Sequence, residues 1–180
     1  MKTLVIHPND PTTDFLKKIY EGKDYTVFDC YNYTNDDLIN AIISHDRIIM
    51  CGHGSSDGLF DINNGGFIID NSIVPYLQTK ECICIWCNAD VFVEDYGLTG
   101  LYTGMFISEV EEAYLFQINE SMNDIDFSNN VFSGLLGTII DKYELSEVFD
   151  ILKKCYYDKE NDVMIFNNER IFYEAGQLPV

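Results

Sequence analysis

The sequence predicts an α/β protein built as a three-layer sandwich, in which a mostly parallel central sheet is covered by helices on both faces. Short apolar runs alternate with amphipathic segments along much of the chain, a pattern typical of βαβ units. Two of the runs, 47–52 and 81–87, are almost unbroken in their apolar character. Such runs favour parallel strands that are buried on both faces of a sheet.

The first part of the chain shows two strand signals, each followed by a helix signal. Thr3-Leu4-Val5-Ile6 is a β-branched run that ends at a Pro-Asn-Asp-Pro turn, after which Thr12, Thr13 and Asp14 are candidate helix caps. The same succession recurs further on. We expect strands at 3–6 and 25–28, and helices at about 12–20 and 34–43.

The middle of the chain combines a hairpin signal with a second core strand. Asn63-Asn64-Gly65-Gly66 separates two short apolar runs, and Asn and Gly tolerate the positive φ of tight hairpin turns. We expect a hairpin from 59–62 and 67–70, a short helix at 72–79 and a strand at 81–87. The glycine-rich segment 97–104 is interpreted as a mobile loop beside the site.

The last third is predicted to be mainly helical. Ser108-x-x-Glu111 matches the capping-box pattern, so a helix is expected from about residue 108. Two longer helices are expected at 128–143 and 145–157. The apolar runs 163–166 and 170–173 predict a terminal hairpin or a pair of edge strands.

Composition limits the classes of function. The 180 residues fit one domain, 1–180, and 11 Lys plus Arg against 30 Asp plus Glu give a net charge of −19, which opposes nucleic-acid binding. No apolar stretch approaches the length of a membrane span, and the start of the chain lacks the pattern of an export signal. Six cysteines without such a signal favour the reducing cytoplasm.

Two side chains that suit nucleophilic catalysis follow the two core strands. His53 lies in Gly52-His53-Gly54 after the first strand, and Cys87 ends the second. If the strands are neighbours, both side chains emerge at one edge of the sheet, where an imidazole can serve as base for a thiol. The amides of Gly54 and Cys87 are candidate donors to an oxyanion.

These residues resemble the caspase-like cysteine peptidases of clan CD, a family that includes legumains, gingipains and bacterial CHAT-type proteins. The resemblance lies in a hydrophobic strand that ends in His53-Gly54 and a second one that ends in Cys87, and it covers about residues 1–115. It implies a caspase-like fold, His53 as base and acid, Cys87 as nucleophile, and a peptide or protein substrate.

Acidic residues near the pair are candidates for recognising that substrate. A carboxylate from Asp57, Asp90, Glu94 or Asp95 would favour Arg or Lys at the cleavage position, and the net charge of −19 suits a basic substrate. No cofactor and no metal are expected, because Cys82 and Cys84 share one strand face while Cys87 lies beyond it. The oligomeric state is not predicted.

Two other classes of function stay open at this stage. The first is a catalytically inactive caspase-like module that acts by protein–protein interaction, motivated by the bulky neighbours Trp86 and Asn88 of Cys87 and by the short loops. The second is a flavodoxin-like or TIR-like small-molecule binder. That class needs a phosphate-binding turn after the first strand, whereas His7-Pro8-Asn9-Asp10-Pro11 lacks glycine and contains two prolines without amide donors.

Overall fold

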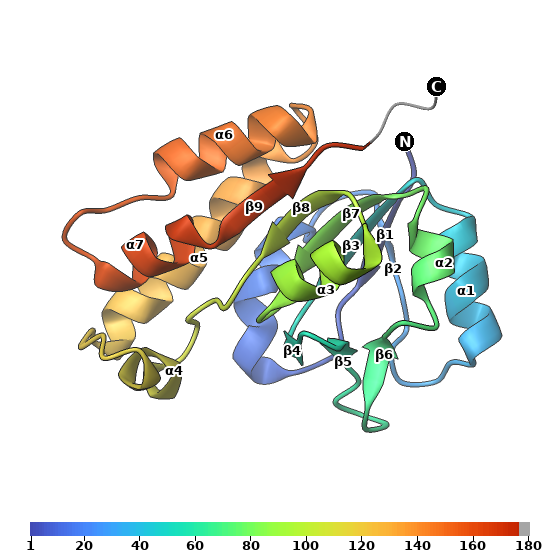
Figure 1. Cartoon of the computed structure of the whole chain (residues 1–180), viewed down its shortest axis with the longest axis horizontal. Helices are drawn as coiled ribbons and strands as arrows, with labels where there is room; N and C mark the ends of the chain where they lie inside the picture. Colours follow the sequence, from blue (N-terminus) through green and yellow to red (C-terminus); the bar gives the residue numbers. More distant parts are fainter. Residues whose placement is uncertain (177–180) are drawn as a thin grey trace.

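A six-stranded sheet forms the centre of the protein, and the computed structural model describes it over residues 1–176. The strand order is β2-β1-β3-β7-β8-β9, and every neighbouring pair is parallel except the antiparallel pair β8 and β9. Helices lie on both faces (Figure 1), so the predicted α/β class is confirmed. The strands are β1 (Thr3–Ile6), β2 (Thr26–Val27), β3 (Arg47–Cys51), β7 (Glu81–Ile85), β8 (Gly100–Thr103) and β9 (Ile171–Glu174).

Alternation along the strands divides the core between the two faces. In β3, Ile48 and Met50 join one buried cluster while Ile49 and Cys51 join the other, as the two-residue period of a strand requires. The first cluster is covered by α1 (Asn35–Ile43), α2 (Val74–Leu77) and α3 (Ala89–Tyr96), and the second by η1 (Pro11–Ile19), α5 (Met122–Ile139) and α6 (Leu145–Cys155).

The helix after β2 begins where the sequence predicts. Thr34 is its N-cap, since its hydroxyl accepts from the Asp37 amide at 3.2 Å and Asp37 Oδ2 accepts from the Thr34 amide at 2.9 Å. Two backbone amides of the first turn are thereby satisfied. The helix after β1 differs from expectation, because η1 is a 3₁₀ helix capped by Asp10 rather than by Thr12 to Asp14.

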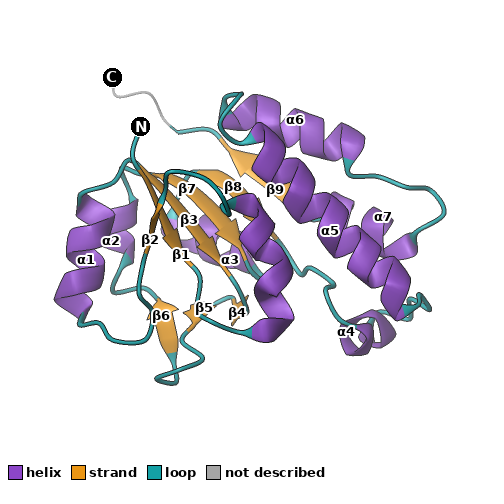
Figure 2. Cartoon of the chain, turned by 180° about the vertical axis from the view of Figure 1, so that it is seen from behind, coloured by secondary structure: helices purple, strands orange, loops and turns teal. Residues whose placement is uncertain are grey.

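A small antiparallel sheet stands beside the carboxyl ends of the central strands (Figure 2). It contains the predicted hairpin as β5 (Gly58–Phe60) and β6 (Phe67–Ile69), with one more strand, β4 (Gly54–Ser55), on the side of β5. Because β4 begins only two residues after β3 ends, the segment that carries His53 is short and its path is fixed at both ends.

The prediction of a mobile loop at 97–104 is wrong, because β8 lies inside this segment and is buried. Gly100 has a φ of 133°, and a Cβ at this position would lie 1.8 Å from the Cys82 carbonyl oxygen. The glycine therefore allows close strand pairing rather than loop mobility. A glycine count cannot separate these two roles.

The prediction of a strand at 163–166 is also wrong, since these residues belong to α7 (Asp162–Glu169). Asn161 caps this helix through its side-chain oxygen, which accepts from the Met164 amide at 2.8 Å. A short apolar run fits a buried helix turn as well as a strand, so the pattern alone does not decide. The second run, 170–173, does form an edge strand, β9.

Three other helix boundaries shift. The helix expected from 108 is α4 (Val110–Leu115), the one expected from 128 starts at Met122 after Ser121 and Asp124 form a capping box, and α2 is shorter than 72–79. Within residues 1–176, no helix combines the length and the apolar character needed to cross a membrane.

Candidate functional site

The two core strands that precede His53 and Cys87 are direct neighbours. β3 and β7 pair in parallel, and their last registered pair is Cys51 with Ile85. His53 and Cys87 each follow that pair by two positions, and the Gly52 amide still donates to the Ile85 carbonyl at 3.1 Å. The two strands are thus neighbours, which is the condition on which the pairing of His53 with Cys87 depends, and both side chains start from the same end of the sheet.

His53 is held from one side by the start of η1. Its Nε2 lies 2.7 Å from the Thr12 hydroxyl oxygen and 3.8 Å from Asp10 Oδ2. Thr12 has one hydroxyl proton and donates it to Asp10 Oδ1 at 2.9 Å. The remaining lone pairs of Thr12 can only accept, so Nε2 of the neutral ring carries the proton.

This arrangement leaves Nδ1 of His53 as the basic nitrogen. Among residues 1–176, Nδ1 makes no hydrogen bond, so its lone pair is available to a proton donor. Orientation of a base by a third group recurs in nucleophilic sites. Sequence reasoning missed Asp10 and Thr12, since they lie about forty positions from His53 and read as an ordinary helix start.

Cys87 is partly buried, and its thiol lies close to two groups from the segment that follows β8. Sγ donates to the Phe106 carbonyl at 3.4 Å and lies 3.9 Å from Glu112 Oε1. Burial raises the pKa of the Cys87 thiol to about 11, with a further contribution from the negative charge of Glu112. The thiol is therefore protonated at neutral pH in this arrangement.

Glu112 is a rigid part of the site. Its Oε2 accepts from the Ser108 amide at 2.7 Å, the Ser108 hydroxyl at 3.1 Å and the Glu109 amide at 3.2 Å. These bonds fix the carboxylate at the start of α4, with Oε1 turned toward Cys87. Sequence reasoning missed the contact of this glutamate with the thiol, because the two residues are 25 positions apart.

The backbone around Cys87 has the geometry of a tight strand-to-helix turn. Asn88 is left-handed, with a φ of 63°, and α3 begins at Ala89. A left-handed residue other than glycine costs free energy and often marks a functional position. The N-terminus of α3 stabilises negative charge nearby, which opposes the effect of Glu112 on the thiol.

Gly54 packs directly on the Trp86 indole. A Cβ at Gly54 would lie 2.3 Å from Trp86 Cδ1, and the indole Nε1 donates to the Ser55 carbonyl at 3.0 Å. The Phe60 amide donates to the His53 carbonyl, so antiparallel alternation turns the Gly54 amide away from β5. This amide is thus free of the β5 ladder, as its predicted role as an oxyanion donor needs.

The four acids predicted for substrate recognition lie in different places, and Glu94 lines a groove at the other end of the sheet, away from Cys87. Asp90 is in the first turn of α3, close to Cys87, and its Oδ1 is buried without a hydrogen-bond partner in residues 1–176. Asp57 is exposed in the turn between β4 and β5. Asp95 is in the last turn of α3, which runs back toward the other edge of the sheet, so its expected position beside Cys87 is corrected.

His53 and Cys87 do not hydrogen-bond each other in the structure as described for residues 1–176. Each interacts with a carboxylate from the start of α4. The negative charge of Glu112 raises the pKa of Cys87, and the charge of His53 lowers the pKa of Glu109, which is raised by its other surroundings. Burial is the largest cause of that raised pKa, followed by Glu112. The edge thus presents a thiol, an imidazole and two carboxylates.

No group of three or more His, Cys, Asp or Glu side chains in residues 1–176 is arranged to hold a metal ion. Cys30, Cys51, Cys82 and Cys84 are buried, whereas Cys155 is exposed. The chemistry available at the edge is acid–base and nucleophilic.

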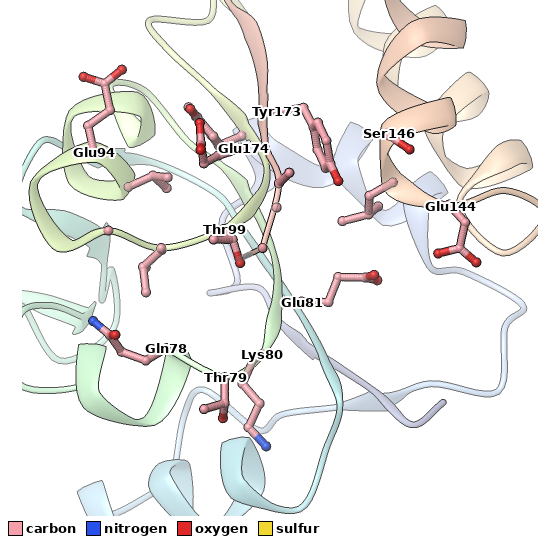
Figure 3. A pocket seen from close by; sticks show the side chains of 18 residues that line it. Gln78, Thr79, Lys80, Glu81, Glu94, Thr99, Glu144, Ser146, Tyr173 and Glu174 are labelled. Carbon is pink, nitrogen blue, oxygen red and sulfur yellow. The ribbon is translucent and has the colours of Figure 1, made fainter. Parts of the chain in front are cut away.

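A groove of about 1150 Å³ lies at the other end of the sheet, opposite to His53 and Cys87. It is lined by the starts of β7, β8 and α6 (Figure 3). Its acidic lining residues are Glu81, Glu94, Glu144 and Glu174. Lys80 also lines it, but its ammonium donates to the carbonyls of Ile43 and His45 at 3.1 and 2.7 Å. The groove is separated from Cys87 by the length of the strands.

Comparison with known proteins adds no family to this geometry. No protein-family model matches the chain, and no curated protein matches it.

Proposed function

We propose that the protein is a cysteine endopeptidase of the caspase-like type, or a close descendant, with Cys87 as nucleophile and His53 as base and acid. The observation that supports this most is the parallel pairing of β3 and β7 in a register that brings both residues to one sheet edge. The free Nδ1 of His53 and the tight turn after Cys87 fit the same role.

The proposed reaction has two stages. Nδ1 of His53 takes the thiol proton, the Cys87 sulfur forms a bond to the peptide carbonyl carbon, and the developing oxyanion is stabilised by the amides of Gly54 and Cys87. The carbon–nitrogen bond breaks as His53 returns its proton to the leaving amine. Water then attacks the thioester with His53 as base, which releases the acid and restores the thiol.

The described arrangement is a resting form of this proposed enzyme. The thiol proton is held by the Phe106 carbonyl and faced by Glu112, so Cys87 reacts only when its proton passes to His53. A basic group of the substrate, bound near Asp90, adds positive charge that favours the thiolate. The proposal therefore favours Arg or Lys at the cleavage position.

The test is labelling with a thiol-reactive peptidyl probe that carries a basic residue at the cleavage position. We expect labelling of the wild-type protein at Cys87 and none at this position in Cys87→Ala, with strongly reduced labelling in His53→Ala. The exposed Cys155 serves as an internal control for non-specific reaction. Equal labelling of the wild type and Cys87→Ala would remove the proposed nucleophile.

The second candidate is a catalytically inactive module that binds a protein partner. It is favoured by the raised pKa of Cys87 and by apolar side chains exposed around the end of α4, among them Tyr114 and Leu115, which are 64% and 78% exposed. An alkylation rate of Cys87 that follows a single high pKa, with no peptide hydrolysis, would favour this candidate.

A further inference from the structure

A cavity smaller than the groove of Figure 3 lies next to Thr12, the residue that contacts His53. Its volume is about 320 Å³, near the lower limit for small-molecule sites and suited to a single side chain. Thr12, which bonds His53 Nε2, is part of its wall. The wall is formed by η1, the start of α4 and the first half of α5.

The charged groups of this cavity all carry the same sign. Glu109, Glu111 and Asp126 line it, whereas no lysine or arginine does. Lys18 approaches its border, but its ammonium bonds to Asn130 Oδ1 at 2.5 Å. The pKa of Glu109 is raised by burial and by the carboxylates of Glu112 and Glu111. A positive group in the cavity would relieve this repulsion.

A second observation concerns Asn129, whose side-chain amide has an oxygen without a hydrogen-bond partner in residues 1–176. Asn129 is 4% exposed and lines the cavity, and its Nδ2 donates to the Ser108 carbonyl at 2.9 Å. This bond fixes the orientation of the amide. Its Oδ1 is buried without a hydrogen-bond partner in residues 1–176. A buried acceptor is normally satisfied, so this residue of the cavity wall carries an acceptor that residues 1–176 leave unpaired.

The remaining lining suits the stem of a long cationic side chain. Phe15, Val110, Met122 and Ile125 supply apolar surface, along which the methylene groups of lysine or arginine can pack. The ligand indicated by the cavity therefore has an aliphatic stem and a positively charged group with N–H donors.

We propose that this cavity is a binding subsite for one basic side chain, arginine or lysine, of a peptide that passes His53. The assignment of a peptide ligand rests on the proposed function, whereas the preference for a basic group rests on the three carboxylates and on Asn129. The subsite is distinct from the position beside Asp90 and from the groove at the opposite edge.

The subsite can be tested without catalysis. The Cys87→Ala protein is titrated with N-acetyl-arginine methylamide, and binding is followed by amide chemical shifts. We expect the largest shifts in 11–15, 108–111 and 122–130, and we expect the isosteric N-acetyl-citrulline methylamide, which lacks the charge, to bind at least about five-fold more weakly. Equal binding of the two compounds would overturn the proposal, as would shifts confined to the groove that contains Glu81 and Glu174.

A pair of variants with the same charge change gives a second criterion. Asp126→Asn removes a carboxylate of the subsite, while Asp150→Asn removes an exposed one on α6, away from both cavities. We expect the affinity for the arginine compound to fall about five-fold in Asp126→Asn and to stay unchanged in Asp150→Asn. Equal effects of the two variants would contradict a local site.

The outcomes also separate this subsite from the proposed peptidase. Binding that depends on Asp126, in a protein whose wild type hydrolyses no peptide, would support the subsite and count against the enzyme. Peptide hydrolysis without selective binding of the arginine compound would support the enzyme and overturn the subsite.

Discussion

At the scale of single residues, the reactivity of Cys87 depends on the groups that face its sulfur. Phe106 offers a carbonyl that accepts from the thiol, and Glu112 a carboxylate whose negative charge favours the thiol over the thiolate. The start of α3 acts in the opposite direction. Burial, followed by the negative charge of Glu112, raises the pKa of Cys87 to about 11.

Replacing Glu112 by glutamine tests this balance. The amide oxygen can accept the bonds from Ser108 and Glu109, while the neutral amide group faces Sγ, so the pKa of Cys87 should fall. A fall of about one unit gives about tenfold more thiolate at pH 8. We expect alkylation of Cys87 by iodoacetamide, followed by peptide mass spectrometry, to accelerate by that factor while Cys155 is unaffected. An unchanged rate at Cys87 would show that Glu112 does not control the thiol.

The buried side chain of His7 makes the stability of the protein depend on pH. Its Nδ1 lies 2.8 Å from the Tyr20 hydroxyl and its Nε2 2.9 Å from the Thr13 hydroxyl, and burial lowers its pKa from 6.5 to about 4. The unfolded chain therefore binds a proton at higher pH than the folded protein. Its contribution to stability is complete above pH 6.5 and is lost as the pH falls toward 4.

The expected effect is a loss of about 3 kcal/mol in the free energy of unfolding over that interval. Urea unfolding of the wild type and of His7→Gln at about pH 7 and about pH 4.5 measures it. The glutamine cannot take up a proton here, so the variant should lose less stability over the same range. Identical pH dependence in the two proteins would exclude His7 as the cause.

At the scale of elements, the close pairing of β7 and β8 depends on Gly100. In Gly100→Ala the new Cβ would lie 1.8 Å from the Cys82 carbonyl oxygen at a φ of 133°, so the pair must separate. We expect a loss of more than about 3 kcal/mol in the free energy of unfolding. Failure of the variant to accumulate as folded protein would agree with this expectation.

Gly65→Ala is the matched control for that substitution. Gly65 also has a positive φ, 76°, but nothing lies within 4 Å of its added Cβ. Gly65→Ala should lower the free energy of unfolding by about 1 kcal/mol, because only the unfavourable backbone conformation of alanine contributes. Similar losses in both variants, measured by urea unfolding, would contradict the steric role of Gly100.

The elements also show what the sequence can and cannot predict. β3 and β7 were predictable as central strands because unbroken apolar runs mark such strands, whereas their pairing with each other was a condition that the sequence left open. α7 was not predictable from its four apolar residues, because the local cap of Asn161 on the Met164 amide is supported by the bonds of Asn161 to the Asp124 carbonyl and of Asn167 to the Ile107 carbonyl, which join distant segments. The contact of Thr12 with His53 and that of Glu112 with Cys87 likewise join distant segments, which a single sequence does not reveal.

At the scale of the whole molecule, the net charge of −19 is the dominant electrostatic feature. Folding brings the carboxylates closer together, and salt screens their repulsion. We expect the melting temperature to rise between about 20 and about 300 mM NaCl, by about 2–4 °C for each kcal/mol gained. Most of the rise should occur at the low end of this range. A melting temperature that is constant or falls would show that attractive pairs prevail over the net repulsion.

The sheet edge also joins distant parts of the chain into one site. His53 and Cys87 come from neighbouring strands, Asp10 and Thr12 from the start of η1, and Glu112 from α4. The central proposal is that this assembly transfers an acyl group to the Cys87 sulfur.

Acid-quenched mass spectrometry after mixing with an arginine peptide ester tests that proposal most directly. The predicted result is a thioester on the peptide that contains Cys87, absent in Cys87→Ala, formed much more slowly in His53→Ala, and slowed in Thr12→Val, in which the bond to Nε2 is lost. An acyl group found on Cys155 alone, or none on any cysteine while the ester is consumed, would contradict it.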